Sequence, residues 1–174
     1  MGFKGGLNFY SYVWGDPVNL IDPLGMNPNG PNNSYIANMS NPILQMLLKP
    51  PYGKLKKHYG ESDECVAATK HFSNAPCSDC WRPGPRVLGN PGLAQGTAIA
   101  TFNNQGRFLG NSGIYVGQGI SPNSLYIIDQ WPGHGENLRE LDPRPGDPSN
   151  DSYSYRVISV PPGMTSSKCI CGSW

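Results

Sequence analysis

The chain has 174 residues, with 13 Lys and Arg against 12 Asp and Glu, so its formal net charge is +1. Nucleic-acid binding depends on clustered basic side chains that neutralise phosphates, and anionic lipid attracts the same side chains. We therefore expect neither a nucleic-acid nor a membrane partner. Gly (22 residues) and Pro (18) are frequent while charged residues make up only 14%, which indicates a turn-rich α+β or β-rich domain and not a helical bundle.

The first 26 residues differ in character from the rest of the chain, because aromatic residues alternate with turn residues from Gly6 to Met26. The stretch ends in Asp22-Pro23-Leu24-Gly25-Met26 and resembles the end of the Rhs-repeat core of bacterial polymorphic toxins. That resemblance implies a β-cage shell that encloses a variable C-terminal toxin and cuts the chain just after this motif. Asp22, Gly25 and Met26 are then candidate processing residues, the Rhs core shell is a partner, and residues 27–174 are the released part. Most of the shell is absent from this chain, so we expect no self-cleavage.

Residues 27–58 are predicted to be a linker with one short helix. The Asn-, Pro- and Gly-rich composition of residues 27–42 buries too little apolar surface to order itself. The run Ile43 to Lys49 has the length of two helical turns, and Pro50-Pro51 stops it.

Residues 59–174 are predicted to form the catalytic domain, which begins with a helix over residues 62–72. Ser62 is the expected cap, Asp63 and Glu64 suit the positive end of the helix dipole, and Cys65 falls in the first turn. Strands are predicted at Thr97–Phe102, Gly113–Gln118, Leu125–Gln130 and Tyr153–Val160. The predicted fold class is α+β, with the helix that carries Cys65 packed on an antiparallel sheet of about four to six strands.

Five short motifs occur in order along this domain. They are Glu64-Cys65-Val66-Ala67, then Trp81…Gly84…Val87, then Gly96 to Phe102, then Gly113-Ile114-Tyr115-Val116, then Asp129-Gln130-Trp131. Together they resemble the NlpC and CHAP superfamily of papain-like cysteine peptidases and amidases. The resemblance implies a papain-like fold and cleavage of amide bonds in peptidoglycan stem peptides or cross-links. It implies neither a cofactor nor a metal.

The resemblance makes Cys65 the nucleophile and Asp129, or else Gln130, the group that orients the base. A helix N-terminus favours the thiolate, which is the reactive form of cysteine; the alternative is an inert buried helix cysteine. Trp81 and Trp131, with Glu64, are expected to line the substrate cleft, and core packing is the alternative for the two tryptophans.

Ser112 stands where the superfamily has its catalytic histidine. A hydroxyl does not take the thiol proton near neutral pH, so the usual Cys–His pair is missing. Three explanations stay open: an engineered replacement of an original histidine, natural divergence to weak or no activity, or substitution by another histidine. His134 is the best substitute, on an expected flexible Gly loop after the Asp129 strand; His58 precedes the helix, and His71 points away from Cys65.

The remaining four cysteines form two close pairs, Cys77 with Cys80 and Cys169 with Cys171. Disulfides, a zinc site and free thiols all remain possible for them on spacing alone.

These features predict a secreted antibacterial effector that acts in the periplasm of a target bacterium and has a cognate immunity protein. One alternative is a catalytically inactive module that binds the cell wall or the immunity protein. Another is an Rhs toxin of a different class, such as a nuclease, against which the near-neutral charge argues.

Overall fold

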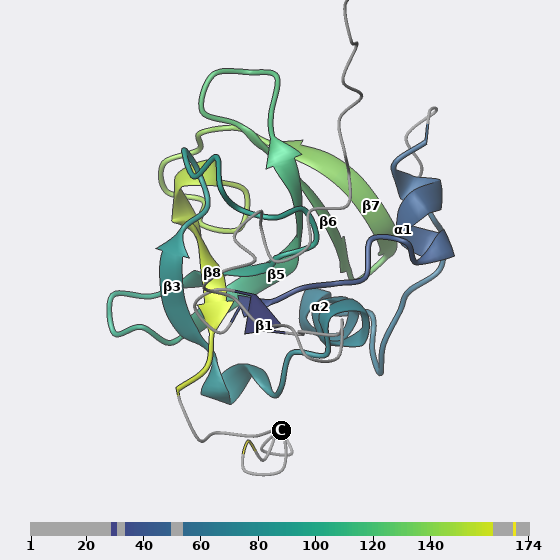
Figure 1. Ribbon diagram of the computed structural model, residues 1–174, viewed down its shortest axis with the longest axis horizontal. Helices are drawn as coiled ribbons and strands as arrows, with labels where there is room; N and C mark the ends of the chain where they lie inside the picture. The colour runs from purple at the N-terminus through teal and green to yellow at the C-terminus, as the bar shows by residue number, and fades with distance from the viewer. Residues whose placement is uncertain (1–28, 31–33, 50–53, 162–168, 170–174) are drawn as a thin grey trace, which may run out of the picture.

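A six-stranded antiparallel sheet, in the order β3-β8-β4-β5-β6-β7, forms the body of the molecule (Figure 1). The structure is a computed structural model that describes residues 29–30, 34–49, 54–161 and 169. The strands of this sheet are β3 (Arg82–Arg86), β4 (Ala98–Phe102), β5 (Phe108–Gln118), β6 (Leu125–Trp131), β7 (His134–Leu141) and β8 (Tyr155–Ser159). Neighbouring strands are antiparallel throughout.

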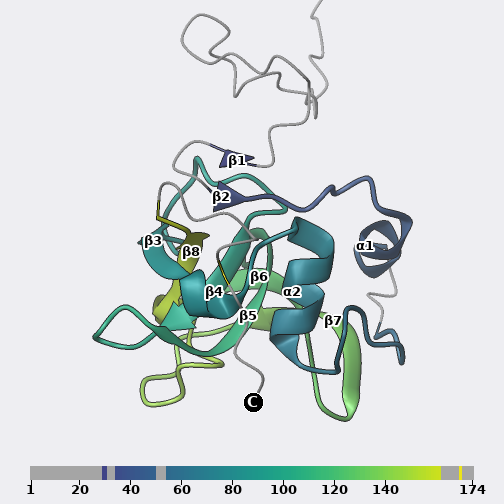
Figure 2. The ribbon, with the colours of Figure 1, turned by 90° about the horizontal axis from the view of Figure 1, so that it is seen from below.

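Helix α2 (Cys65–Ser73) packs against β5 and β6 on one face of the sheet (Figure 2). It buries Ala68 and Phe72, which lie four residues apart on one helix face and join Ile114 and Ile128 of the sheet in the main hydrophobic core. The helix ends at Asn74, whose φ of 56° is left-handed and lets the chain turn away. The packing places the first residue of α2, Cys65, beside β5, with its Sγ 3.6 Å from the Gly110 carbonyl oxygen.

The opposite face of the sheet buries a second hydrophobic cluster. Its members are Val87, Ile99, Tyr115, Leu125, Ile127, Leu141, Tyr155 and Val157, with Leu88 and Leu93 packed against them. The middle strands are therefore apolar on both faces, as the sequence predicts for a covered sheet.

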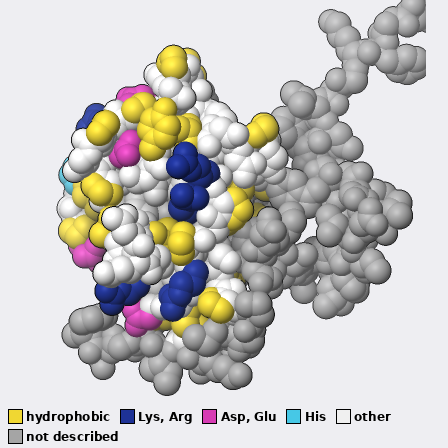
Figure 3. All heavy atoms as spheres, turned by 90° about the vertical axis from the view of Figure 1, so that its left-hand side faces the viewer, with side chains coloured by type: hydrophobic (Ala, Val, Ile, Leu, Met, Phe, Trp, Pro, Cys, Tyr) yellow, Lys and Arg dark blue, Asp and Glu magenta, His cyan; other side chains and the backbone are white. Residues whose placement is uncertain are grey.

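Each outer strand of the sheet is protected against further pairing. β3 has the sequence RPGPR, whose two prolines lack the N–H that a pairing strand needs and whose arginines are exposed. Lys and Arg side chains stand out on the face of the molecule that carries β3 (Figure 3). At the other edge, Leu55 donates from its N–H to the Glu136 carbonyl at 2.9 Å, and Glu136 donates to the Lys57 carbonyl at 3.2 Å.

Part of the expected linker packs on the domain. The segment contains β1 (Asn29–Gly30), β2 (Ser34–Tyr35) and α1 (Pro42–Leu47). Ala37 is buried and donates from its N–H to the Gly96 carbonyl, and Leu44 and Leu47 of α1 join the main core. These apolar side chains offset the ordering cost that the Asn-, Pro- and Gly-rich composition predicts. The short helix is confirmed, one residue before its predicted start.

The four predicted strands are confirmed, with shifts at their ends. The sequence does not predict β3 and β7. The sequence RPGPR of β3 is typical of a turn, and the sequence HGENLREL of β7 lacks the alternation of apolar and polar residues that indicates a strand. The predicted helix begins three residues later than expected, at Cys65, with Glu64 as N-cap residue and no side-chain cap. Ser62 is not the helix cap: its hydroxyl accepts from the Glu64 N–H at 3.3 Å, in the turn before the helix.

One cysteine from each close pair takes part in a disulfide, Cys80–Cys169, which joins residues 89 positions apart in the sequence. Cys65 is the free cysteine among the described residues, and no group of metal-ligating side chains occurs in that part of the chain. None of the helices formed by the described residues has the length and apolarity to cross a membrane. The predicted processing residues Asp22, Gly25 and Met26 lie outside the described residues.

Candidate active site

Cys65 is the first residue of α2 and lies where two cavities meet. Glu64, Cys65 and Gly110 line both a cavity of about 740 Å³ and a smaller one of about 340 Å³. The larger cavity is also lined by Glu61, Lys70, His71 and Phe108, and the smaller one by Asn111, Trp131, Arg139 and Asn150. The residue is only 4% exposed, and it forms part of the wall of both cavities.

The thiol of Cys65 has only weak polar contacts. Its Sγ is 3.6 Å from the Gly110 carbonyl oxygen, the acceptor for the S–H. Burial raises the pKa of this thiol above its usual range, polar contacts with Ser112 oppose the rise, and the Asp129 and Glu64 carboxylates add to it. The direction of this pKa shift runs against the expected thiolate for the chain as it stands, because desolvation is its largest cause and no cation is among the groups that shift it.

Ser112 lies on β5, fully buried, facing α2. Its Oγ is 2.9 Å from Thr69 Oγ1, and Thr69 Oγ1 donates to the Cys65 carbonyl at 3.0 Å. The hydroxyl and the backbone N–H of Ser112 also contact the thiol and lower its pKa, so Ser112 acts toward the sulfur as a donor. A serine oxygen is too weak a base to remove the thiol proton.

Asp129, the expected orienting group, is held in an ion pair. Its carboxylate is fully buried and accepts from Arg139 Nε at 2.9 Å and Arg139 Nη2 at 2.7 Å. Asn111 Nδ2 adds a bond at 3.2 Å. Burial raises the pKa of this carboxyl and Arg139 opposes that rise. Asp129 lies close enough to influence the Cys65 thiol, but its hydrogen bonds go to Arg139 and Asn111.

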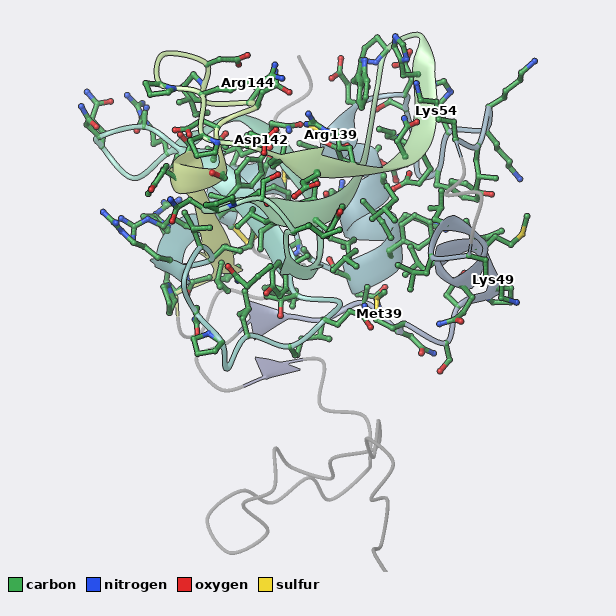
Figure 4. All side chains as sticks on the ribbon, turned by 90° about the horizontal axis from the view of Figure 1, so that it is seen from above. Met39, Lys49, Lys54, Arg139, Asp142 and Arg144 are labelled. Carbon is green, nitrogen blue, oxygen red and sulfur yellow. A yellow bond between two sulfur atoms is a disulfide. The ribbon has the colours of Figure 1, made fainter. Side chains whose placement is uncertain are left out.

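In Figure 4, Arg139 lies in the upper part of the view, between Asp142 and Arg144 on its left and Lys54 on its right. Its guanidinium also packs 5.2 Å from the ring of Trp131. The residue links the Asp129 ion pair to the wall of the smaller cavity.

Gln130, the second candidate for orienting a base, is fully buried and bonds only to the backbone before α2. Its Nε2 donates to the carbonyls of Tyr59, Ser62 and Glu64 at 2.9, 3.0 and 3.1 Å, and its Oε1 accepts from the Tyr59 N–H at 2.8 Å. The side chain joins β6 to the loop that leads into Cys65.

The three histidines take separate positions, and none of them is among the groups that hydrogen-bond or shift the Cys65 thiol. His134 is the first residue of β7, opposite Trp131 in the hairpin register, and its ring stacks on Trp131 at 4.7 Å. The flexible loop expected there is wrong, because Pro132-Gly133 makes a two-residue turn between strands. His71 is exposed against Phe72, and His58 is half-buried with its Nε2 unpartnered among the described residues.

The two tryptophans differ in position: Trp81 lies in the core, and Trp131 lines the smaller cavity. Trp81 is fully buried, donates from Nε1 to the Pro76 carbonyl at 2.9 Å and packs edge-on against Phe108, so its predicted place in the cleft is wrong. Trp131 is half-buried and lines the smaller cavity with Cys65 and Glu64, as expected.

Three residues of the site were not anticipated. Thr69 follows Cys65 by four residues, so helical spacing alone places both on one face. Asn111 precedes Ser112 and Arg139 lies on the unpredicted strand β7, and neither carries a local signal of its contact with Asp129.

Comparison with known proteins supplies the family. The model of the family described as domesticated amidase effector 2 matches residues 49–158. That range includes α2, most of the sheet and every residue of the site described above. The chain belongs to the domesticated amidase effector 2 family.

Two relatives extend the comparison. Over 77 residues the chain is 34% identical to the type VI secretion amidase effector 2 protein of Salmonella typhi, a match that spans 41% of this chain and 56% of that protein. A solved structure of type 6 secretion amidase effector 2 has a TM-score of 0.50 with 22% identity, covering 63% of this chain and 91% of the other. The second likeness supports the fold of this domesticated amidase effector 2 member.

Proposed function

We propose that this chain is an antibacterial effector that hydrolyses amide bonds in peptidoglycan peptides with Cys65 as nucleophile. The observation that carries the proposal is the position of Cys65. In a member of an amidase effector family, a free thiol opens α2 at the junction of two cavities. A papain-like fold, with a nucleophilic helix on an antiparallel sheet, fits this arrangement.

The reaction proceeds through a thioester. The thiolate of Cys65 attacks the carbonyl carbon, and the negative charge that develops on oxygen is stabilised by N–H groups at the start of α2. The C–N bond then breaks, the departing amine takes up a proton, and water hydrolyses the acyl-enzyme. The proton must leave the thiol and reach the amine, which is the usual task of a histidine.

Ser112 is the residue that limits this reaction in the printed chain. Its hydroxyl faces the thiol from the position that the NlpC and CHAP resemblance gives to the base, but it shuttles no proton near neutral pH. The raised pKa of the Cys65 thiol agrees with the absence of an imidazolium partner. We infer that turnover is slow with Ser112 and depends on a histidine at this position.

A direct test compares Ser112→His with the parent chain on purified peptidoglycan, with released peptides followed by mass spectrometry. We expect the histidine to raise the cleavage rate roughly 10²- to 10⁴-fold, the range of general acid–base catalysis. The rate of alkylation by iodoacetamide should also reach its half-maximum at lower pH. Ser112→Ala is the matched control: it should cleave no faster than the parent, and its alkylation should not shift to lower pH, because it loses a contact that lowers the thiol pKa.

Cys65→Ala in the Ser112→His background sets the baseline. If Ser112→His released no more peptide than this double variant, the amidase proposal would be wrong. If the parent cleaved as fast as Ser112→His and Ser112→Ala lost that rate, Ser112 itself would be the base.

A second function is favoured by the same serine: binding of cell-wall peptides or of the immunity protein without turnover. Saturable binding of muropeptides by the parent, with no cleavage by either the parent or Ser112→His, would identify it. Membership of an amidase effector family leaves the nuclease alternative without support.

The setting that fits this function is delivery into a target bacterium and action in its periplasm. The Cys80–Cys169 disulfide supports an oxidising compartment. A cognate immunity protein would cover the cleft at Cys65 to protect the producing cell. The Rhs-type tail at residues 6–26, with cleavage after Met26, remains part of the proposal, and N-terminal sequencing of the toxin after co-expression with an Rhs core shell tests it.

A further inference from the structure

The peptide bond between Glu64 and Cys65 is the last before the nucleophile, and among the described residues its carbonyl has hydrogen-bond partners while its N–H has none. The Glu64 carbonyl accepts from Gln130 Nε2 at 3.1 Å and from the Ala67 N–H at 3.0 Å. The N–H of Cys65, at the other end of the same peptide, donates to no group among the described residues. It belongs to the first turn of α2, whose N–H groups have no partner within the helix.

The direction of that N–H follows from the position of the carbonyl. A trans peptide is planar, so its C=O and N–H point in opposite directions. Holding the Glu64 oxygen therefore also fixes the line along which the Cys65 N–H points. A hydrogen bond to the carbonyl further polarises the peptide and strengthens its N–H as a donor.

The usual devices for fixing the start of a helix are missing here. Glu64 makes no side-chain cap, and the first turn of α2 contains no acidic residue. Gln130 takes their place from a different element, β6, and its three acceptors lie 66 to 71 residues earlier in the chain. It is fully buried, so solvent does not compete for these bonds.

The loop held by Gln130 also packs closely along α2. Gly60 has a φ of +88°, and a Cβ at this position would lie 2.3 Å from the Ala67 carbonyl oxygen. The ring of Tyr59 lies 5.3 Å from that of Phe72. Gln130 therefore fixes a loop that already follows the helix, and its contribution is concentrated at the Glu64 carbonyl.

We propose that Gln130 is a positioning residue for the oxyanion site: it holds the Glu64 carbonyl so that the Cys65 N–H points at the oxygen of a tetrahedral intermediate. It acts through the backbone and makes no contact with the base or the reacting atoms. This role rests on the proposed cysteine chemistry and differs from the role of orienting a histidine.

The test compares two reactions of the same sulfur at one pH, about 9, near the ordinary pKa of a cysteine thiol. The raised pKa of Cys65 lowers the thiolate fraction equally in both reactions, so it cancels in their ratio. Alkylation by iodoacetamide proceeds at a tetrahedral carbon and creates no oxyanion. Acylation by p-nitrophenyl acetate passes through a tetrahedral oxyanion. For Gln130→Glu and Gln130→Met we expect the acylation rate to fall roughly tenfold or more relative to the alkylation rate, because a preorganised donor is worth about 10²- to 10³-fold.

Gln118 provides the matched control. It is a glutamine of β5 that donates to the Val87 carbonyl at 3.2 Å and accepts from the Gly89 N–H at 3.1 Å, in a loop away from the Cys65 cavities. Gln118→Glu and Gln118→Met should leave the ratio of the two rates unchanged. Cys65→Ala measures reaction at other side chains, which is subtracted.

Near-ultraviolet circular dichroism establishes that each variant is folded. If Gln130→Met and Gln130→Glu both fail to fold, the ratio of acylation to alkylation is measured for Gln130→Asn instead. This variant keeps the amide but shortens its reach by one methylene, so the same fall in the ratio is expected. A ratio that stays at the parent value in a folded Gln130 variant overturns the proposal, as does an equal loss of both reactions. Neither reagent needs peptidoglycan or the Ser112→His substitution. If the peptidoglycan assay failed while the ratio of acylation to alkylation still fell in the Gln130 variants, only the proposed function would be refuted.

Discussion

Glu136 on β7 is fully buried, and neither of its carboxyl oxygens has a hydrogen-bond partner among the described residues. Burial raises its pKa to about 8, and the Asp129 charge adds to the rise. The same carboxyl in turn raises the pKa of Tyr59, after desolvation of that phenol. Glu136 is therefore a buried acid that holds its proton at neutral pH and takes no part in the proposed chemistry.

The raised pKa of Glu136 makes stability depend on pH in a definite direction. The folded state holds the proton more tightly than the unfolded chain, so its contribution is full below about pH 4.5 and is lost as pH rises through about 8. Glu136→Gln removes this ionisation. We expect the variant to match the parent near pH 5 and to melt at a higher temperature than the parent near pH 9, in thermal unfolding followed by circular dichroism.

Glu140, on the same strand, is the control for this measurement. Hydrogen bonds from Ser124 and from the Ser121 N–H lower its pKa to about 2, so it is ionised throughout the range from pH 5 to 9. Glu140→Gln should leave the slope of melting temperature against pH unchanged. A parent-like slope in Glu136→Gln would show that Glu136 does not titrate in this range.

The segment of residues 54–57 acts as a short edge element that covers β7. Lys54 pairs with Asn137, and two backbone bonds join Leu55 and Lys57 to Glu136. The close approach requires Gly135, because a Cβ there would lie 2.0 Å from the Leu55 carbonyl oxygen and 2.8 Å from that of Lys57.

Gly135→Ala should therefore force this segment away from β7. We expect a loss of about 1–3 kcal/mol in the free energy of unfolding, the usual cost of overpacking, measured by urea denaturation. Gly117→Ala on β5 is the matched control, since nothing lies within 4 Å of a Cβ there. Equal stabilities of the two variants would contradict the proposed close packing.

The elements that the sequence predicts are those with a strong local pattern. The helix at Cys65 and the strands around Ile99, Ile114 and Ile128 carry runs of apolar residues that local rules detect. The edge strands β3 and β7 carry polar, Pro and Gly residues instead. The position of β8 between β3 and β4 depends on pairing across more than 50 residues, such as Ile99 with Val157.

The site divides in the same way. Short sequence motifs predict Cys65, Ser112 and Trp131. Cys65 and Trp131 line the smaller cavity, and Ser112 lies on β5 beside α2. The partners of Asp129 and Gln130 do not follow, since Arg139 is on an unpredicted strand and the Tyr59 loop is 71 residues from Gln130. A motif identifies which residues carry chemistry, but the groups that hold them are set by tertiary structure.

At the scale of the whole molecule, the Cys80–Cys169 disulfide connects the turn before β3 to a residue beyond β8. Both cysteines are buried in the main core, beside the fully buried Trp81. The bond closes a loop of 89 residues, which reduces the entropy of the unfolded chain by an amount that corresponds to about 4–5 kcal/mol in the chain-entropy model. Full stability is therefore reached only where this bond forms, outside a reducing cytoplasm.

Loss of the Cys80–Cys169 bond should lower the thermal unfolding midpoint by roughly 8–20 °C, taking about 2–4 °C for each kcal/mol in a domain of this size. Cys169→Ser should lower it without reductant, because this substitution removes the bond to Cys80. Cys65→Ser is the control: it removes the free thiol, so its melting temperature should respond to reductant as the parent does. If Cys169→Ser melted with the parent under oxidising conditions, the disulfide would add nothing to stability and the dependence on an oxidising compartment would be lost.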